Sequence, residues 1–400
     1  MKWFNWMEFV NKVKQQFLEN RQKVLDGKLV GLPWYEIYPR LGQFIPVLPP
    51  ATQIMFTANS GIGKSHSWVG MILLTLYTLK KKYPNKEYKI RFLISLLEDT
   101  KEDLTTRLFS SILLLKYNIR SDGLELNSRK GAPLPEHIKI KLDDVQKEIE
   151  LLLSEHCEIN DSTTNPTGIY KWGRAISNKL GTHHTKEMDF TNDKGEIYKQ
   201  TVYSHYTPND PDEQVIWIVD NLNNLQQETH EGRLLTERET INRWTRTYGR
   251  LQITKHWKWT LVNIMQQSAD SERPQFNNRG ELIVERCKPS LDGLGNSKEC
   301  QRDHILIFGL FAPNRYGITE YGASPTTYPY NITTLKDAFR SLIILKSNIS
   351  ETNKEIPMYF DGAASIYREL ELLNKSSPKI NKSGWIDNYH KMLANRQITY

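Results

Sequence analysis

The sequence contains little cysteine and no long hydrophobic run. Its three cysteines, Cys157, Cys287 and Cys300, are too few for a disulfide framework and show no paired metal-ligand spacing, so a reducing compartment is expected. The most apolar stretch, Met71–Leu79, falls far short of the roughly 20 residues that cross a bilayer. Glu8 interrupts what would have to be the apolar core of a signal peptide. These absences predict a soluble, cytoplasmic protein without a membrane partner.

An excess of charge of one sign is also lacking. Lysine and arginine number 53 and aspartate and glutamate 46, so the formal net charge of the 400 residues is only +7. This small basic excess permits a polyanionic partner without requiring one. Hydrophobic residues make up 38% of the chain and charged residues 25%, which provides apolar material for a large core and excludes a wholly disordered chain.

What the sequence does contain is a repeated alternation of strand and helix patterns. Several apolar runs are continuous, which is typical of strands buried on both faces. Helical patterns lie between them, so we predict an α/β fold with a mostly parallel central sheet flanked by helices. The predicted strands are Gln53–Thr57, Ile90–Leu96, Val215–Val219, Thr260–Met265, Ile305–Leu310, Ser341–Leu345 and Met358–Phe360. The predicted helices are Lys64–Leu79, Leu104–Leu115, Asp143–Glu155, Gly168–Leu180 and Leu235–Gln252.

Three segments stand outside this alternation. Residues 1–27 are predicted to form a linker-type helix, because the apolar residues of Trp3–Phe17 recur at spacings of three and four and make one stripe. This stripe packs either on its own domain or on a neighbouring subunit. Residues 28–373 would form the α/β domain, with an inserted β-hairpin at about residues 181–213. Residues 374–400 would be a polar tail.

A phosphate-binding loop lies between the first predicted strand and the helix that follows it. Small residues let backbone N–H groups curl around phosphate oxygens, and the N-terminus of the helix adds a favourable dipole. Lys64 would neutralise the β- and γ-phosphates of ATP, and the Ser65 hydroxyl would ligate Mg²⁺. Ala58 replaces the usual first glycine, which is tolerable at negative φ. The residues expected to bind the nucleotide are Ala58, Asn59, Ser60, Gly61, Ile62, Gly63, Lys64 and Ser65.

Three polar residues follow other predicted strands and complete the expected site. Asp220 ends the strand Val215–Val219 and would hold Mg²⁺ through water, although many strands end in aspartate. Glu98 follows Ile90–Leu96 and would orient or deprotonate the attacking water; the alternative is an N-cap of the next helix. Gln266 either senses the γ-phosphate or belongs to an ordinary polar loop.

This order of phosphate loop, strand–Glu, strand–Asp and strand–Gln resembles the RecA-like P-loop motor domain of DnaB-type replicative hexameric DNA helicases. The resemblance covers roughly residues 28–370. It implies a hexameric ring that hydrolyses ATP with Mg²⁺ and moves on single-stranded DNA. It also implies that Arg107 belongs to the nucleotide site and that Lys346 reaches the nucleotide of the neighbouring subunit.

The chain also departs from that family. Asn348 stands where the family has an arginine finger, and Arg315 is the candidate substitute. The insertion at 181–213 has no counterpart, and nothing resembles the family's N-terminal domain that contacts primase, which suggests a phage or mobile-element origin. The segment Ser271–Arg302, which precedes the family's acidic pair, carries six basic and five acidic residues. It therefore offers point contacts to DNA phosphates rather than a basic groove.

The sequence thus predicts an ATP-dependent DNA helicase or translocase of the DnaB type that acts on single-stranded DNA in replication. The alternative is a RecA-like ATPase that hydrolyses ATP without unwinding duplex, such as a recombinase, a helicase loader or a packaging accessory. A third hypothesis is a nucleotide-dependent regulatory or assembly module with no nucleic-acid partner.

Overall fold

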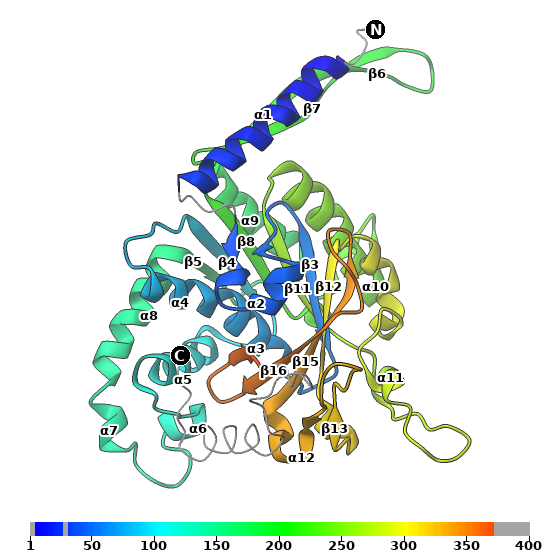
Figure 1. Cartoon of the computed structure of the whole chain (residues 1–400). Helices are drawn as coiled ribbons and strands as arrows, with labels where there is room; N and C mark the ends of the chain where they lie inside the picture. The colour runs from blue at the N-terminus through cyan, green and yellow to red at the C-terminus, as the bar shows by residue number, and fades with distance from the viewer. Residues whose placement is uncertain (1–4, 27–30, 372–400) are drawn as a thin grey trace.

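A nine-stranded sheet forms the centre of the protein, with the strand order β17-β16-β15-β12-β3-β11-β8-β4-β5 (Figure 1). The computed structural model describes residues 5–26 and 31–371. Neighbouring strands from β12 to β5 pair in parallel, whereas β15, β16 and β17 add antiparallel pairs at one end of the sheet. The strands are β3 (Gln53–Ala58), β4 (Ile90–Leu96), β5 (Cys157–Asn160), β8 (Gln214–Asp220), β11 (Thr260–Gln266), β12 (Leu306–Phe311), β15 (Phe339–Ser347), β16 (Glu355–Asp361) and β17 (Ile366–Glu369).

Helices cover both faces of the sheet, because alternate residues of each strand point to opposite sides. On β8, Ile216 and Ile218 pack in one apolar cluster with the helices of residues 64–82 and 101–117. Trp217 and its neighbours pack in a second cluster on the other face. The predicted α/β class is therefore confirmed. The covering helices are α2 (Pro39–Phe44), α3 (Lys64–Trp68), a π-helical turn (Val69–Leu73), α4 (Leu74–Lys82), α5 (Lys101–Tyr117), α8 (Leu142–His156), α9 (Pro166–Leu180) and α10 (Glu237–Asn242), which a π-helical segment (Arg243–His256) continues.

The remaining elements are short and lie in the connections. Two-stranded pairs are formed by β1 (Leu32–Pro33) with β2 (Val47–Leu48), β9 (Thr229–His230) with β10 (Arg233–Leu234), and β13 (Glu320–Tyr321) with β14 (Tyr330–Asn331). The short helices are α6 (Gly123–Leu126), α7 (Glu136–Lys139), α11 (Val284–Cys287) and α12 (Ile332–Leu335).

Every predicted strand and helix is present, with bounds that differ by a few residues, but two strands were not predicted. These are β5 and β17, the strands at the two edges of the sheet. Each has four residues, and neither forms the long apolar run that identifies a central strand.

The hairpin predicted for residues 181–213 is present and projects from the body of the protein. Its strands β6 (Gly181–Thr191) and β7 (Ile197–Pro208) pair antiparallel. At its base the Tyr206 hydroxyl donates to the Ser177 carbonyl of α9 at 3.1 Å, whereas residues 191–201 at its tip are all exposed. Helix α9 therefore anchors the hairpin at one end only.

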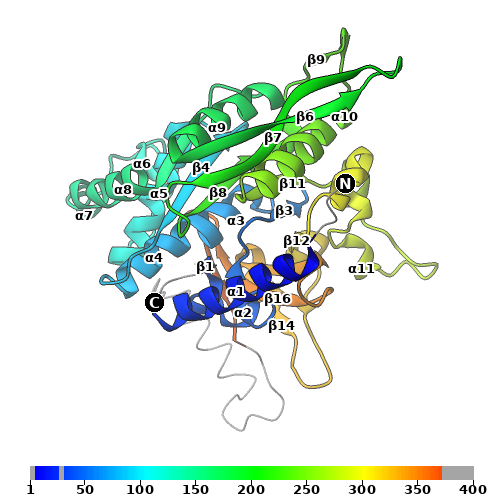
Figure 2. The same ribbon diagram turned by 90° about the horizontal axis from the view of Figure 1, so that it is seen from above.

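Helix α1 (Trp6–Leu25) forms a second projecting arm. It has no buried residue, and Trp6 and Phe17 of its apolar stripe are 69% and 67% exposed. The hypothesis that this stripe packs on its own domain is therefore wrong; Trp3 and the predicted tail 374–400 lie outside the described residues. The arms rise from the same end of the protein in Figure 1 but lie apart when seen from above in Figure 2. Neither α1 nor another helix in the described ranges has the length and apolar content of a membrane span.

A close approach between α9 and β8 sets the position of the strand that ends at Asp220. Gly173 of α9 faces the ring of Trp217, and a Cβ at Gly173 would lie only 2.0 Å from Cη2 of that ring. The ring is fully buried, and its Nε1–H donates to Ser95 Oγ at 3.1 Å. Only a residue without a side chain fits at position 173.

We therefore expect Gly173→Ala to lower the free energy of unfolding by about 1–3 kcal/mol, because the added methyl group must displace an enclosed indole ring. At an unconstrained helix position the same exchange would stabilise by up to about 1 kcal/mol. Urea unfolding followed by circular dichroism measures the change. Lys171→Ala, on the exposed side of α9, is the control, and an unchanged or raised stability of Gly173→Ala would contradict the packing.

Candidate nucleotide-binding site

The phosphate loop connects β3 to α3 with the conformation that anion binding requires. Gly61 and Gly63 have φ of +66° and +103°, whereas Ala58 ends β3 without a positive φ. A Cβ on Gly63 would lie 2.8 Å from Cζ of Phe360, so a side chain is excluded there on steric grounds as well. Gly63 is the N-cap of α3, so the loop leads directly into the N-terminus of a helix.

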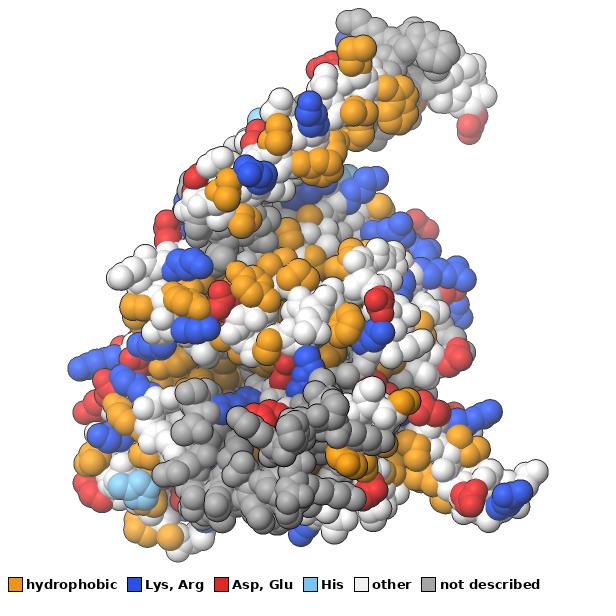
Figure 3. Space-filling model, viewed as in Figure 1, with side chains coloured by type: hydrophobic (Ala, Val, Ile, Leu, Met, Phe, Trp, Pro, Cys, Tyr) orange, Lys and Arg blue, Asp and Glu red, His pale blue; other side chains and the backbone are white. Residues whose placement is uncertain are grey.

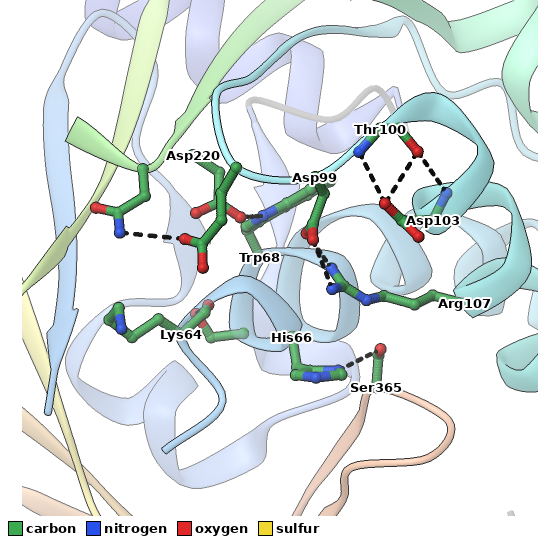
Figure 4. Close-up of polar contacts among 12 residues, drawn as sticks. Lys64, His66, Trp68, Asp99, Thr100, Asp103, Arg107, Asp220 and Ser365 are labelled. Atoms are coloured by element: carbon green, nitrogen blue, oxygen red, sulfur yellow. Dashed lines mark hydrogen bonds and ion pairs between the residues drawn. The ribbon is translucent and has the colours of Figure 1, made fainter. Parts of the chain in front are cut away.

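Lys64 is the first residue of α3 and is largely buried, with 8% of its surface exposed. Burial lowers the pKa of its ammonium group, while the nearby charges of Glu98, Asp220 and Glu272 act in the opposite direction. The structure thus brings the predicted cation and the two predicted carboxylates into one site. Figure 4 shows Lys64 and Asp220 on the same side of α3.

Asp220 ends β8 and is 1% exposed. Its Oδ2 accepts a hydrogen bond from Trp68 Nε1 at 2.7 Å, and the Ser65 hydroxyl also donates to the carboxylate (Figure 4). Burial raises the pKa of Asp220 to about 6, against the lowering effect of these two donors. Its Oδ1 is buried and finds no hydrogen-bond partner among the described residues. A carboxylate oxygen left without a donor beside a serine hydroxyl fits a water-coordinated Mg²⁺.

Glu98 lies two residues beyond the end of β4, and β4 pairs with β8 so that Leu96 faces Asp220. Its exposed carboxylate accepts a hydrogen bond from Asn221 Nδ2 at 3.3 Å. The N-cap of α5 is Thr100, which forms a capping box with Asp103. The alternative that Glu98 caps this helix is therefore wrong.

Arg107 and Gln266 lie near this edge of the sheet but make other contacts. Arg107 binds Asp99 with two hydrogen bonds of 2.6 and 3.0 Å, so its guanidinium group is held beside the phosphate-loop helix (Figure 4). Gln266 faces Ala58 in the sheet register, and its side chain lines a cavity of about 350 Å³ together with Asn223 and Arg238. No hydrogen bond joins Gln266 to the phosphate loop within the described part of the chain.

The structure places Arg315 and Lys346 at different edges of the sheet. The Arg315 guanidinium donates to the carbonyl oxygen of Ser60, so it lies on the phosphate loop of its own chain. The expectation that it reaches a neighbouring subunit is not supported by this contact. The Lys346 ammonium group donates to the carbonyl oxygens of Gln301 and His304 at 2.6 and 2.7 Å. Because β15 runs antiparallel to β12, Lys346 lies near the start of β12, away from the phosphate loop.

Four contacting residues were missed by the sequence reasoning: Trp68, Asp99, Asn221 and Glu272. Trp68 lies one helical turn after Lys64, which is a spacing that could have suggested its position beside the site. Asp99 and Asn221 each follow a predicted site residue directly. The contact of Glu272 joins residues 212 positions apart, and no local pattern indicates it.

Replacing the buried carboxylate gives a pH-dependent test. The ordinary pKa of the group is 3.8, so folding must bury a charge above pH about 6, and this cost disappears as the pH falls through 6 towards 3.8. Asp220→Asn should therefore raise the free energy of unfolding by about 1–3 kcal/mol at pH 8, with the gain vanishing near pH 4. Urea unfolding at pH 8, 6 and 4 measures it.

Asp193→Asn, in the exposed turn of the hairpin, is the matched control and should change stability at pH 8 by less than about 0.5 kcal/mol. An Asp220→Asn variant that is less stable than the parent at pH 8 would show that the hydrogen bonds outweigh the cost of burial.

Solved structures share this fold, although no protein-family model and no curated protein sequence matches the chain. A DnaB-like replicative helicase, studied with its interactions with primase, is 14% identical with a TM-score of 0.59, over 89% of this chain and 66% of that chain. A separately solved helicase ATPase domain is 15% identical with a TM-score of 0.59, over 90% of this chain and 98% of that chain. The chain therefore has the RecA-like fold of DnaB-type motor domains.

Proposed function

We propose that the chain is an ATP-dependent DNA helicase or translocase of the DnaB type that acts on single-stranded DNA in replication. The observation that carries this proposal is the meeting of Lys64, Asp220 and Glu98 at the carboxyl edge of the parallel strands. An ammonium group and two carboxylates beside a loop of N–H donors are the groups that ATP hydrolysis with Mg²⁺ requires. The fold shared with helicase motor domains supports a helicase over other ATPases.

Each residue of the site would have a distinct task. The loop N–H groups and Lys64 would hold the phosphates of ATP, and Ser65 and Asp220 would hold Mg²⁺, which neutralises phosphate charge when bound. Trp68 keeps Oδ2 of Asp220 engaged, so Oδ1 is the oxygen left for the metal's water shell. Glu98 would orient the attacking water and accept its proton.

A hexameric ring would supply what one chain leaves incomplete. Hydrophobic side chains run along α1 at the top of Figure 3, and they would dock on the next subunit. Lys346 lies away from its own phosphate loop, so it would act on the nucleotide of a neighbour. The segment 273–302 would contact the DNA backbone through separate cations such as Arg273, which is 79% exposed.

One observation favours the alternative of an ATPase that does not unwind duplex. Asn348 stands where the family has its arginine finger, and Arg315, the candidate substitute, is engaged with its own loop. A fork-unwinding assay distinguishes the two functions: hydrolysis stimulated by single strands without strand separation would favour the alternative.

We expect Lys64→Ala to abolish ATP binding and turnover, whereas Glu98→Gln should bind ATP and lose at least about 10²-fold in kcat, because only the proton acceptor is removed. ATP hydrolysis with and without single-stranded DNA, together with equilibrium nucleotide binding, tests this. Lys80→Ala, whose ammonium group pairs with Glu155 on the surface, is the control. DNA-stimulated hydrolysis retained in Lys64→Ala would refute the assignment.

Assembly can be tested separately on α1. Phe17→Glu places a charge in the exposed apolar stripe and should weaken ring formation at least about tenfold, because a carboxylate is costly to bury in an apolar contact. Native mass spectrometry with ATP and single-stranded DNA measures the oligomer. Gln15→Glu, on the opposite side of α1, should leave assembly unchanged. A Phe17→Glu ring as stable as the parent's would exclude α1 from the subunit interface.

A further inference from the structure

A carboxylate from a distant part of the chain is bound to the phosphate loop. Glu272 is the last residue of a 3₁₀ turn, Ala269–Glu272, that begins three residues after β11. Its Oε1 accepts a hydrogen bond from the backbone N–H of Ser60 at 2.6 Å. Ser60 lies in the middle of the phosphate loop, and its N–H belongs to the donors that such a loop offers to an anion. Glu272 therefore occupies one of these donors.

The contact is part of a larger arrangement around the first half of the loop. The Arg315 guanidinium donates to the carbonyl oxygen of the same residue, Ser60. Asn59 Nδ2 donates to the Tyr316 hydroxyl at 2.7 Å, and that hydroxyl in turn donates to the backbone carbonyl oxygen of Glu272 at 3.5 Å. Side chain and backbone of Glu272 are thus both tied to the loop.

The charge of Glu272 also acts on the central cation of the site. It is one of the three carboxylates whose proximity opposes the lowering of the Lys64 pKa by burial. A phosphate bound between Lys64 and the loop would meet the same field and would be repelled by the carboxylate. Moreover, a carboxylate oxygen and a phosphate oxygen cannot both take the Ser60 N–H in a linear hydrogen bond.

The turn that carries Glu272 connects the loop to an exposed segment. Ser268 N–H donates to the carbonyl oxygen of Gly293 at 2.7 Å, and the side chain of Gln267 spans Thr57 and Ser290. Residues 273–281, which follow the turn, are all exposed. Glu272 is therefore the point at which this segment is attached to the nucleotide site.

We propose that Glu272 is a displaceable positioning residue, which holds the segment 273–287 against the phosphate loop and must leave the Ser60 N–H when ATP binds. This inference rests on the proposed binding of ATP by the loop. Because coupling between two sites is reciprocal, a ligand that draws the segment away from the loop raises the affinity for ATP to the same degree.

Glu272→Gln tests the proposal directly. Glutamine keeps an acceptor oxygen for Ser60 but removes the charge, so the variant should bind a fluorescent ATP analogue with Mg²⁺ about five- to tenfold more tightly than the parent, since hydrogen bonds to charged groups are stronger than neutral ones. A purely structural role would leave affinity unchanged or lower it. Glu281→Gln, a carboxylate that pairs with Asn277 within the same segment, is the matched control and should bind like the parent.

Tryptic cleavage after Arg273 and Arg279 gives the second readout. ATP should speed cleavage severalfold in the parent, and Glu272→Gln should be cleaved at the faster rate even without ATP. Equal ATP affinity of Glu272→Gln and the parent, or cleavage that ATP does not change, would overturn this inference alone. A parent chain that binds no ATP would overturn the proposed function and the inference with it.

Discussion

The parallel register of the central strands is the constraint on which the site depends. Asp220 shares a face of β8 with Ile216 and Ile218, which is the face covered by α3, α4 and α5. Its side chain therefore meets Trp68, and pairing of β8 with β4 brings Glu98 to the same edge. A register shift of one residue would turn the carboxylate to the face covered by α9 and separate it from the phosphate loop. The apolar strand pattern and the chemistry are thus set by one alternation.

Burying Asp220 costs stability, and the structure reduces this cost without removing it. Two donors, the Trp68 indole and the Ser65 hydroxyl, engage the carboxylate, yet its pKa is still raised to about 6 and Oδ1 has no partner within the described residues. A site selected for stability alone would have an uncharged residue here. The unsatisfied oxygen is explained if it serves a metal's water shell, since strain retained at a functional site is the usual reason for breaking a packing rule.

Local signals predicted the framework, and contacts between distant segments account for what was missed. The central strands and the phosphate loop could be predicted because continuous apolar runs and a glycine-rich strand-to-helix turn are properties of short sequence windows. The edge strands β5 and β17 lack such a run. The placement of Arg315 on its own loop and the contact of Glu272 with Ser60 depend on how the 3₁₀ turns after β11 and β12 return to the sheet edge, and no window of sequence contains both partners.

The two cations outside the phosphate loop lie at opposite edges of the sheet, and this asymmetry favours an assembly over a single working chain. Lys346 lies near the start of β12, so it can serve only the loop of another copy, and the apolar stripe of α1 also lacks a cover within its own chain. A head-to-tail ring meets both needs with one heterologous interface, because each copy turns its far edge to the next copy's loop. In such a ring the Glu272–Ser60 contact lies on the loop side of that interface. Nucleotide, neighbour and the segment 273–287 would then all act on the same few residues of the phosphate loop.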